Sequence, residues 1–144
     1  MKKITEEKLE TLLEQHKLWL DSNGKEGKRA DLTDMNLSYM DLSNMNLAYA
    51  NLTYANLTEA NLTDANLTNA ILTYAILTRA DLTRADLRFA NLSDANLTDA
   101  NLTDANLRWA NLNCSNLINA NLSGADLEYA KLTNTILERK NFKY

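Results

Sequence analysis

Proline is absent from this chain of 144 residues, and glycine occurs only three times. The rest of the composition is also uneven, because Leu, Ala, Asn, Thr and Asp fill most of the sequence after residue 30. The apolar fraction of 45% is ordinary for a globular protein, and the length fits one domain. A composition biased in this way indicates a sequence built from internal repeats.

Histidine and cysteine each occur once, as His16 and Cys114. A lone cysteine cannot form an intramolecular disulfide, and one histidine with one cysteine cannot supply a zinc site. The glycines form none of the motifs that bind phosphates or dinucleotides. We therefore expect a packing role for His16, an inert surface thiol at Cys114, and no catalytic residue, metal or cofactor.

Strong charge and long apolar runs are missing as well. Residues 30–144 hold 8 basic and 13 acidic residues, so their charge argues against direct binding to nucleic acid. The first ten residues, MKKITEEKLE, lack the apolar run of a signal peptide, and no stretch approaches the roughly 18 apolar residues of a membrane span. These features predict a cytoplasmic protein without membrane contact.

Residues 1–29 are expected to form an N-terminal cap. A helix is predicted from about Thr5 to Leu20, with Thr5 as N-cap and Ile4 packing on Leu9. Residues 21–27 (DSNGKEG) contain two of the three glycines and end the helix. The apolar face of the helix is formed by residues at three-and-four spacing, namely Leu9, Leu12, Leu13, His16, Trp19 and Leu20.

From Leu32 to Leu137 a leucine recurs every five residues, and Phe142 takes the next place, which gives 23 consecutive repeats. Alanine lies two residues before the leucine in 17 of the 23 repeats, usually with Asn or Asp between them. The unit is Ala-(Asn/Asp)-Leu-(Thr/Ser)-X. Its members are called here the alanine, Asn/Asp, leucine, Thr/Ser and variable positions.

A period of five fits neither common element. On a helix each step of five turns by about 140°, so the leucines would spiral round every face, and on a flat strand they would alternate between faces. A coil in which four pentapeptides close one four-sided turn places every leucine and alanine inside. The 23 repeats would then make about 5.75 coils.

The runs ADLTDMNLSYMDLSNMNL and ANLTDANLTDANL resemble the A(D/N)LXX signature of the pentapeptide-repeat family. This resemblance covers about four-fifths of the chain, and HKLWLDSNGKEGKRADL resembles the helix-and-turn lead-in of some members. The resemblance implies the handedness and the square cross-section. We therefore expect an all-β solenoid, a right-handed quadrilateral β-helix over residues 30–144, with an N-terminal capping α-helix.

Exceptions at the alanine position predict how the two ends of the solenoid are covered. Flexible methionines of the first coil would fill the gap below the helix, which predicts capping contacts among Leu9, Leu13, Trp19, Met35, Met40 and Met45. At the far end, Ile136, Phe142 and Tyr144 remain to be covered. They are candidate contacts of a homodimer about a two-fold axis, and a monomer is the alternative.

Equivalent residues of successive coils should form columns along the solenoid. In one column, whose residues are 20 apart in the sequence, all residues are aromatic except Asn69. This aromatic column contains Tyr49, Phe89, Trp109 and Tyr129. Its rings either stack to support the coils or form a docking surface for a protein. Two polar columns are expected to pair between coils: Asn56, Asn96 and Asn116, and Thr58, Thr78 and Thr98. Arg79, Arg84 and Arg88 are expected to pair with Glu59, Asp64, Asp99 and Asp104.

Two functions remain open at this point. The first is a non-catalytic structural or protein-interaction module with an unknown protein partner. The second follows from the resemblance, because some family members mimic B-form DNA and inhibit DNA gyrase, which confers quinolone resistance. The three arginines, the lack of a loop insertion and the lack of a C-terminal dimer helix weaken this alternative.

Overall fold

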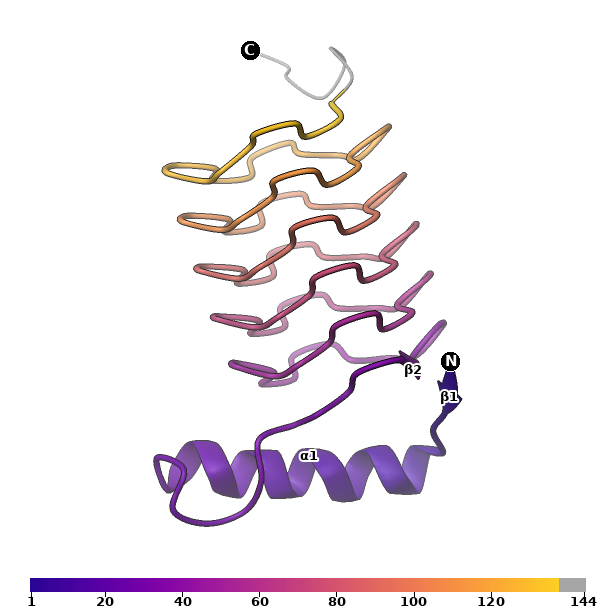
Figure 1. The fold of residues 1–144 in the computed structure, drawn as a ribbon, viewed down its shortest axis with the longest axis vertical. Coiled ribbons are helices and arrows are strands. Elements are labelled where there is room, and N and C mark those ends of the chain that lie inside the picture. The colour runs from indigo at the N-terminus through magenta and orange to yellow at the C-terminus, as the bar shows by residue number, and fades with distance from the viewer. Residues whose placement is uncertain (138–144) are drawn as a thin grey trace.

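A computed structural model describes residues 1–137 of the chain. Its elements are β1 (Lys2–Lys3), α1 (Glu6–Asp21) and β2 (Met35–Asn36), followed by a regular stack of coils joined by single-residue bridges. The helix α1 lies across one end of this stack, and the chain then winds away from it coil by coil (Figure 1).

Both ends of α1 lie one residue from the bounds predicted by the sequence. The Thr5 hydroxyl oxygen accepts the N–H of Lys8 at 3.3 Å, and Glu6 and Glu7 place negative charge at the positive end of the helix dipole. At the other end the N–H of Ser22 donates to the carbonyl of Leu18 at 3.0 Å. The predicted N-cap is thus confirmed.

The segment after α1 folds back closely along the helix. The Lys28 N–H donates to the Gln15 carbonyl at 3.0 Å. Gly27 has a φ of +67°, and a Cβ at this position would lie 2.2 Å from the same carbonyl oxygen. Only glycine fits here, because any side chain would push the linker away from the cap.

Parallel bridges connect each coil with the next along the whole stack, from Asp31 with Asn51 to Asn116 with Ile136. Each coil is therefore four pentapeptides long, and the chain folds as a β-helix. The ladder repeats two bonds: the Leu32 N–H donates to the Asn51 carbonyl at 2.7 Å, and the Asn51 N–H donates to the Ala30 carbonyl at 2.9 Å. The strand β1 adds to the first coil in the same parallel sense, with Lys2 opposite Met35.

Each repeat ends in a tight turn. The N–H of the alanine position donates to the carbonyl of the leucine three residues before it, as Ala50 does to Leu47 at 3.0 Å. The variable position is the third residue of this turn, and its φ is positive in every repeat from Asp34 to Asn134. A positive φ at this place is the mark of a type II turn, which turns the chain sharply enough to form a corner.

Leucine and alanine fill the interior as predicted. The leucine side chains from Leu32 to Leu117 are at most 1% exposed. Burying each leucine stabilises the fold by about 1.5–3 kcal/mol, and the gain recurs at every repeat. Ser115 replaces an alanine inside, and its hydroxyl donates to the Leu112 carbonyl at 2.7 Å, so it is buried with a partner.

No helix within residues 1–137 is both long and apolar enough to cross a membrane.

Candidate functional site

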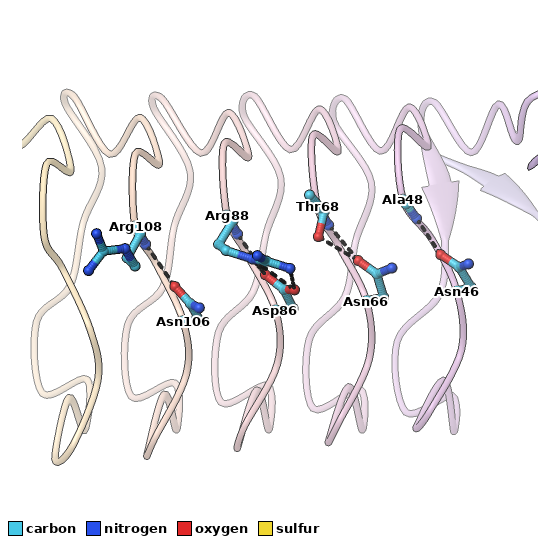
Figure 2. Close-up of polar contacts among 8 residues, drawn as sticks. All are labelled: Asn46, Ala48, Asn66, Thr68, Asp86, Arg88, Asn106 and Arg108. Carbon is cyan, nitrogen blue, oxygen red and sulfur yellow. Dashed lines mark hydrogen bonds and ion pairs between the residues drawn. The ribbon is translucent and has the colours of Figure 1, made fainter.

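The Asn/Asp positions fix the outer surface of each side of the β-helix. Figure 2 shows one side, on which the Asn46 side-chain oxygen accepts the N–H of Ala48 at 3.2 Å and the Asn66 oxygen accepts that of Thr68 at 3.0 Å. The Thr68 hydroxyl donates to the same oxygen at 2.6 Å. A residue at the Thr/Ser position can donate both its backbone N–H and its hydroxyl to this oxygen, which explains why Thr or Ser follows the leucine.

The expected pairing of polar columns between coils is correct only in part. Asn56 reaches Asn36 in the neighbouring coil at 3.5 Å, and Asn111 reaches Asn91 at 3.2 Å. The Thr98 hydroxyl instead donates within its own repeat. The hydroxyls of Thr83 and Thr103 also donate within their own repeats, and each accepts a bond from an asparagine of the next coil.

Three rings of the aromatic column stack on one another. The ring centroids of Phe89 and Trp109 are 6.3 Å apart with 9° between the planes, and those of Trp109 and Tyr129 are 4.2 Å apart with 18°. Their side chains stay 49–57% exposed. Tyr49 belongs to another group, because Asn69 intervenes and Tyr49 packs edge-on against Trp19 at 6.1 Å.

Arg88 and Arg108 directly precede Phe89 and Trp109 in the sequence, and the two arginines lie at equivalent places of successive coils (Figure 2). The Arg88 guanidinium forks onto the Asp86 carboxylate at 2.6–3.0 Å, and this hydrogen bond is the main reason why the pKa of Asp86 is lowered. Arg108 pairs with Glu128 of the next coil and lies 5.7 Å from the Tyr129 ring centroid. The border of the stack is therefore charged but locally neutralised.

The remaining expected ion pairs are found in part. Arg79 lies 2.7 Å from Glu59, and Arg84 binds both carboxylate oxygens of Asp64. The pKa of Asp64 is lowered mainly by its hydrogen bond from Arg84. Arg88 was not expected to pair with Asp86, but the two lie in one repeat, two residues apart. Within residues 1–137, neither Asp99 nor Asp104 forms an ion pair.

A second ring stack was missed by the sequence interpretation. Tyr54 and Tyr74 occupy another column, with centroids 5.0 Å apart and an 8° angle between their planes. They lie one coil apart, so the spacing that identified the aromatic column would have found them too.

The predicted capping residues divide into two groups. Leu9 is buried in the core, and Leu13 packs against that core half-buried, as do the three methionines, Met35, Met40 and Met45. Trp19 lies against the rings of His16 and Tyr49. The helix therefore covers the end of the stack but leaves the methionine side chains partly accessible.

His16 joins α1 to the β-helix. Its side chain is fully buried, and Nδ1 accepts the Ala30 N–H at 3.1 Å, which requires a neutral ring. Burial lowers the pKa of His16; the nearby backbone of Ala48 opposes this effect, and the charge of Arg29 adds to it. Within residues 1–137 the buried Nε2 has no partner within hydrogen-bond distance and geometry. The expected packing role is confirmed, with a hydrogen bond as its additional feature.

Of the three candidate dimer contacts at the far end, one lies within the described residues. Ile136 is 51% exposed and bridges to Asn116. Phe142 and Tyr144, the other candidate dimer contacts, lie outside the described residues.

The described residues offer surfaces for binding and no assembled reactive group. No three His, Cys, Asp or Glu side chains within residues 1–137 are placed to hold a metal ion. Cys114 is exposed and unpaired by any disulfide. The features that stand out are the ring stack and the grooves beside α1, both of which are suited to contacts with another molecule.

Comparisons with known proteins agree with the repeat architecture. The family model described as "Pentapeptide repeats" matches residues 28–64, 60–99 and 100–139, in eight copies. A comparison with functionally curated proteins finds no significant match.

Solved structures of similar proteins include examples from cyanobacteria and a plant. Rfr23 from Cyanothece 51142 is 34% identical, over 77% of this chain and 88% of its own, with a TM-score of 0.74. HetL, involved in heterocyst differentiation regulation in Nostoc sp. strain PCC 7120, is 31% identical over 76% of this chain, which spans 60% of HetL, with a TM-score of 0.68.

A pentapeptide repeat protein of the Arabidopsis thaliana thylakoid lumen is 36% identical, over 74% of this chain and 71% of its own, with a TM-score of 0.55. With repeats matched from residue 28 to residue 139 and coils that each close after four pentapeptides, the chain belongs to the pentapeptide-repeat family.

Proposed function

We propose that this protein is a non-catalytic interaction module, with the aromatic column as a docking surface for another protein. The observation that carries the proposal is the stack of Phe89, Trp109 and Tyr129, three rings that stay about half exposed. Exposed aromatic side chains are enriched where proteins bind one another, and they dominate the energetics of such contacts.

The setting of the stack favours binding. Each ring is attached to a corner of a hydrogen-bonded coil, and its neighbour in the stack limits its rotation. A ring that is already ordered loses little conformational freedom when a partner covers it. The adjacent arginines are paired with carboxylates, so we expect the partner to present flat apolar or π surfaces rather than one sign of charge.

The test compares two aromatic columns. Trp109→Asn removes the central ring, and Asn69 in the same column already has the required φ of +58°, so the fold should tolerate the change. Tyr74→Asn is the matched control in the other column. Wild type and variants are used to capture proteins from the source cell, after thermal unfolding has shown that their stabilities agree.

We expect Trp109→Asn to lose at least one protein that wild type and Tyr74→Asn both retain. The same set of captured proteins for all three would contradict the proposal. A loss that is equal for Trp109→Asn and Tyr74→Asn would also contradict it, because the effect would then not belong to the aromatic column.

The alternative is a DNA-mimicking inhibitor of DNA gyrase. It is favoured by the excess of 13 acidic over 8 basic residues in the repeats. It is weakened by Arg79 and Arg84, which neutralise Glu59 and Asp64 on the surface that would imitate phosphates. A supercoiling assay separates the two functions, and we expect no inhibition at micromolar protein.

Right-handed winding, about 5.75 coils and a cytoplasmic location also belong to the proposal. The first two are supported by the pentapeptide repeats and by coils that each close after four of them. Location requires its own measurement, since one similar protein comes from the thylakoid lumen.

A further inference from the structure

The helix α1 leaves one side of the first coil uncovered. Two adjoining hollows, of about 500 and 570 Å³, run between α1 and this coil and share Glu10, Leu13 and Met45. Together they are called the capping groove. Its lining residues belong to α1 and to the first coil, at the end of the stack across which α1 lies (Figure 1).

The capping groove has an apolar floor. Leu13 and Leu20 come from α1, and Met40 and Met45 come from the first coil, where most other coils have alanine. All four side chains are half-buried. Methionine side chains are flexible and polarizable, and such surfaces adapt to differently shaped apolar partners.

The rim of the capping groove is acidic. Five carboxylates line it against a single lysine: Glu6, Glu10, Glu14, Asp21 and Asp41, with Lys17. Lys17 is already paired with Asp21 at 2.6 Å. The opposite side of α1 differs, because its hollow is lined by three basic residues and two acidic ones: Lys8, Lys28, Arg29, Glu7 and Asp31.

We propose that the capping groove binds an amphipathic basic helix of a partner protein. Apolar side chains of that helix would lie on the methionine floor, and its lysines and arginines would face the acidic rim. The rim extends from Glu6 to Asp21 along α1, about 22 Å at 1.5 Å per residue, which matches a helix of about 15 residues. Nucleic acids and anionic membranes are disfavoured by the same carboxylates.

This surface is separate from the aromatic column, although it also implies protein binding. Trp109 does not line it, so Trp109→Asn should bind the helix as wild type does. The failure of one proposal is thereby distinguishable from the failure of the other.

The experiment uses the full chain and a 15-residue amphipathic peptide built from leucine and lysine. Fluorescence anisotropy of the labelled peptide measures affinity at low and physiological salt. Methyl NMR of labelled methionines measures where the peptide binds. We expect the Met40 and Met45 methyl signals to shift, the Met35 signal to stay, and affinity to fall with salt.

Two charge reversals on α1 provide the matched comparison. Glu10→Lys lies on the groove rim, whereas Glu7→Lys makes the same change of charge at a residue of α1 that does not line the capping groove. We expect Glu10→Lys to weaken binding about fivefold or more, and Glu7→Lys to change it by less than about twofold. Circular dichroism checks that both variants are folded, and Glu14→Lys replaces Glu10→Lys if the latter is not.

Three results would overturn the proposal. One is the absence of binding at millimolar peptide, another is an equal loss for Glu7→Lys and Glu10→Lys, and the third is binding that leaves Met40 and Met45 unshifted.

Discussion

At almost every corner of the β-helix, a residue other than glycine has a left-handed backbone conformation. Their φ at the variable position lies between +54° and +65°, whether the residue is Asp34, Arg84, Trp109 or Cys114. A left-handed conformation costs most L-residues about 1–2 kcal/mol, and asparagine tolerates it best after glycine. The ladder of the β-helix therefore holds these residues in a conformation that they would not adopt alone.

Cys114 tests this cost. The residue is exposed with a φ of +59°, and Asn119 and Asn134 hold the same conformation in later repeats. Cys114→Asn should raise the free energy of unfolding by about 0.5–1 kcal/mol, whereas Cys114→Val should lower it, because a branched side chain fits left-handed backbone poorly. Urea denaturation measures both, and a valine variant as stable as the asparagine variant would refute this account of the corners.

The bond from the Asn/Asp position gives a second prediction. The Asn96 oxygen accepts both the N–H and the hydroxyl of Thr98, at 3.1 and 2.6 Å. Asn96→Ala leaves both donors without this acceptor and should cost about 1–2 kcal/mol of unfolding free energy. Asn96→Asp keeps the acceptor, as Asp81 does for Thr83, and should cost much less. Equal losses in chemical denaturation would show that the bond contributes little.

At this scale the sequence predicted which residues are inside but not how the outer ones bond. A leucine every five residues requires one shared environment, so the interior followed from the period. The corner conformation could have been suspected only from the frequent Asn and Asp at the variable position, and their enrichment was visible. The local bond from Asn to Thr was not predicted, because the period alone does not separate contacts within a repeat from contacts between coils.

Among the elements, α1 depends on a buried histidine for its attachment to the first coil. His16 accepts the Ala30 N–H through Nδ1, and its pKa is lowered chiefly by burial. The unfolded chain binds a proton near pH 6.5 while the folded chain resists it. The stabilising effect of the neutral ring is therefore complete above about pH 6.5 and is lost as the pH falls below that value.

We predict that thermal stability drops between pH 7.5 and pH 5.5. This window surrounds the ordinary pKa of histidine, and His16 is the one histidine of the chain, so it should dominate the pH dependence. In His16→Gln the amide oxygen could still accept the Ala30 N–H, and the profile should become flat, even if the variant is less stable overall. A profile unchanged by this substitution would assign the pH dependence to another group.

The sequence predicted the ends of α1 well, but it predicted less well how α1 covers the first coil. The N-cap and the apolar spacing fix α1 to within one residue at each end. Met40 and Met45 pack against the core at this end, and both side chains remain half-buried. A single helix is narrower than the end of a four-sided coil, and the sequence does not say on which side the uncovered part lies.

For the whole molecule, the described end opposite α1 is the less protected one. Leu127 and Leu132 are only half-buried, and within residues 1–137 their N–H groups have no acceptor. Open edges of this kind invite pairing with another chain. The homodimer at this end stays a prediction, with Ile136 as its visible candidate contact.

Sedimentation over a hundredfold range of protein concentration tests the dimer. We expect a concentration-dependent dimer for wild type and a monomer for Ile136→Glu, because a charge at this exposed apolar position would be desolvated on pairing. Arg79→Glu, in the middle of the stack, is the control for a change of surface charge. A wild type that stays monomeric, or a dimer indifferent to Ile136→Glu, would remove the hypothesis.

The bridges between equivalent residues of successive coils restrict how a gene for this protein can change in length. Insertion of one pentapeptide would preserve the buried leucines and alanines, but it would rotate every later residue by a quarter of a coil. An insertion between Phe89 and Trp109 would place these rings on different sides, and the ring stack would be lost without loss of the fold. Duplication of four pentapeptides would keep all columns intact, so selection for a surface column should favour length changes in whole coils.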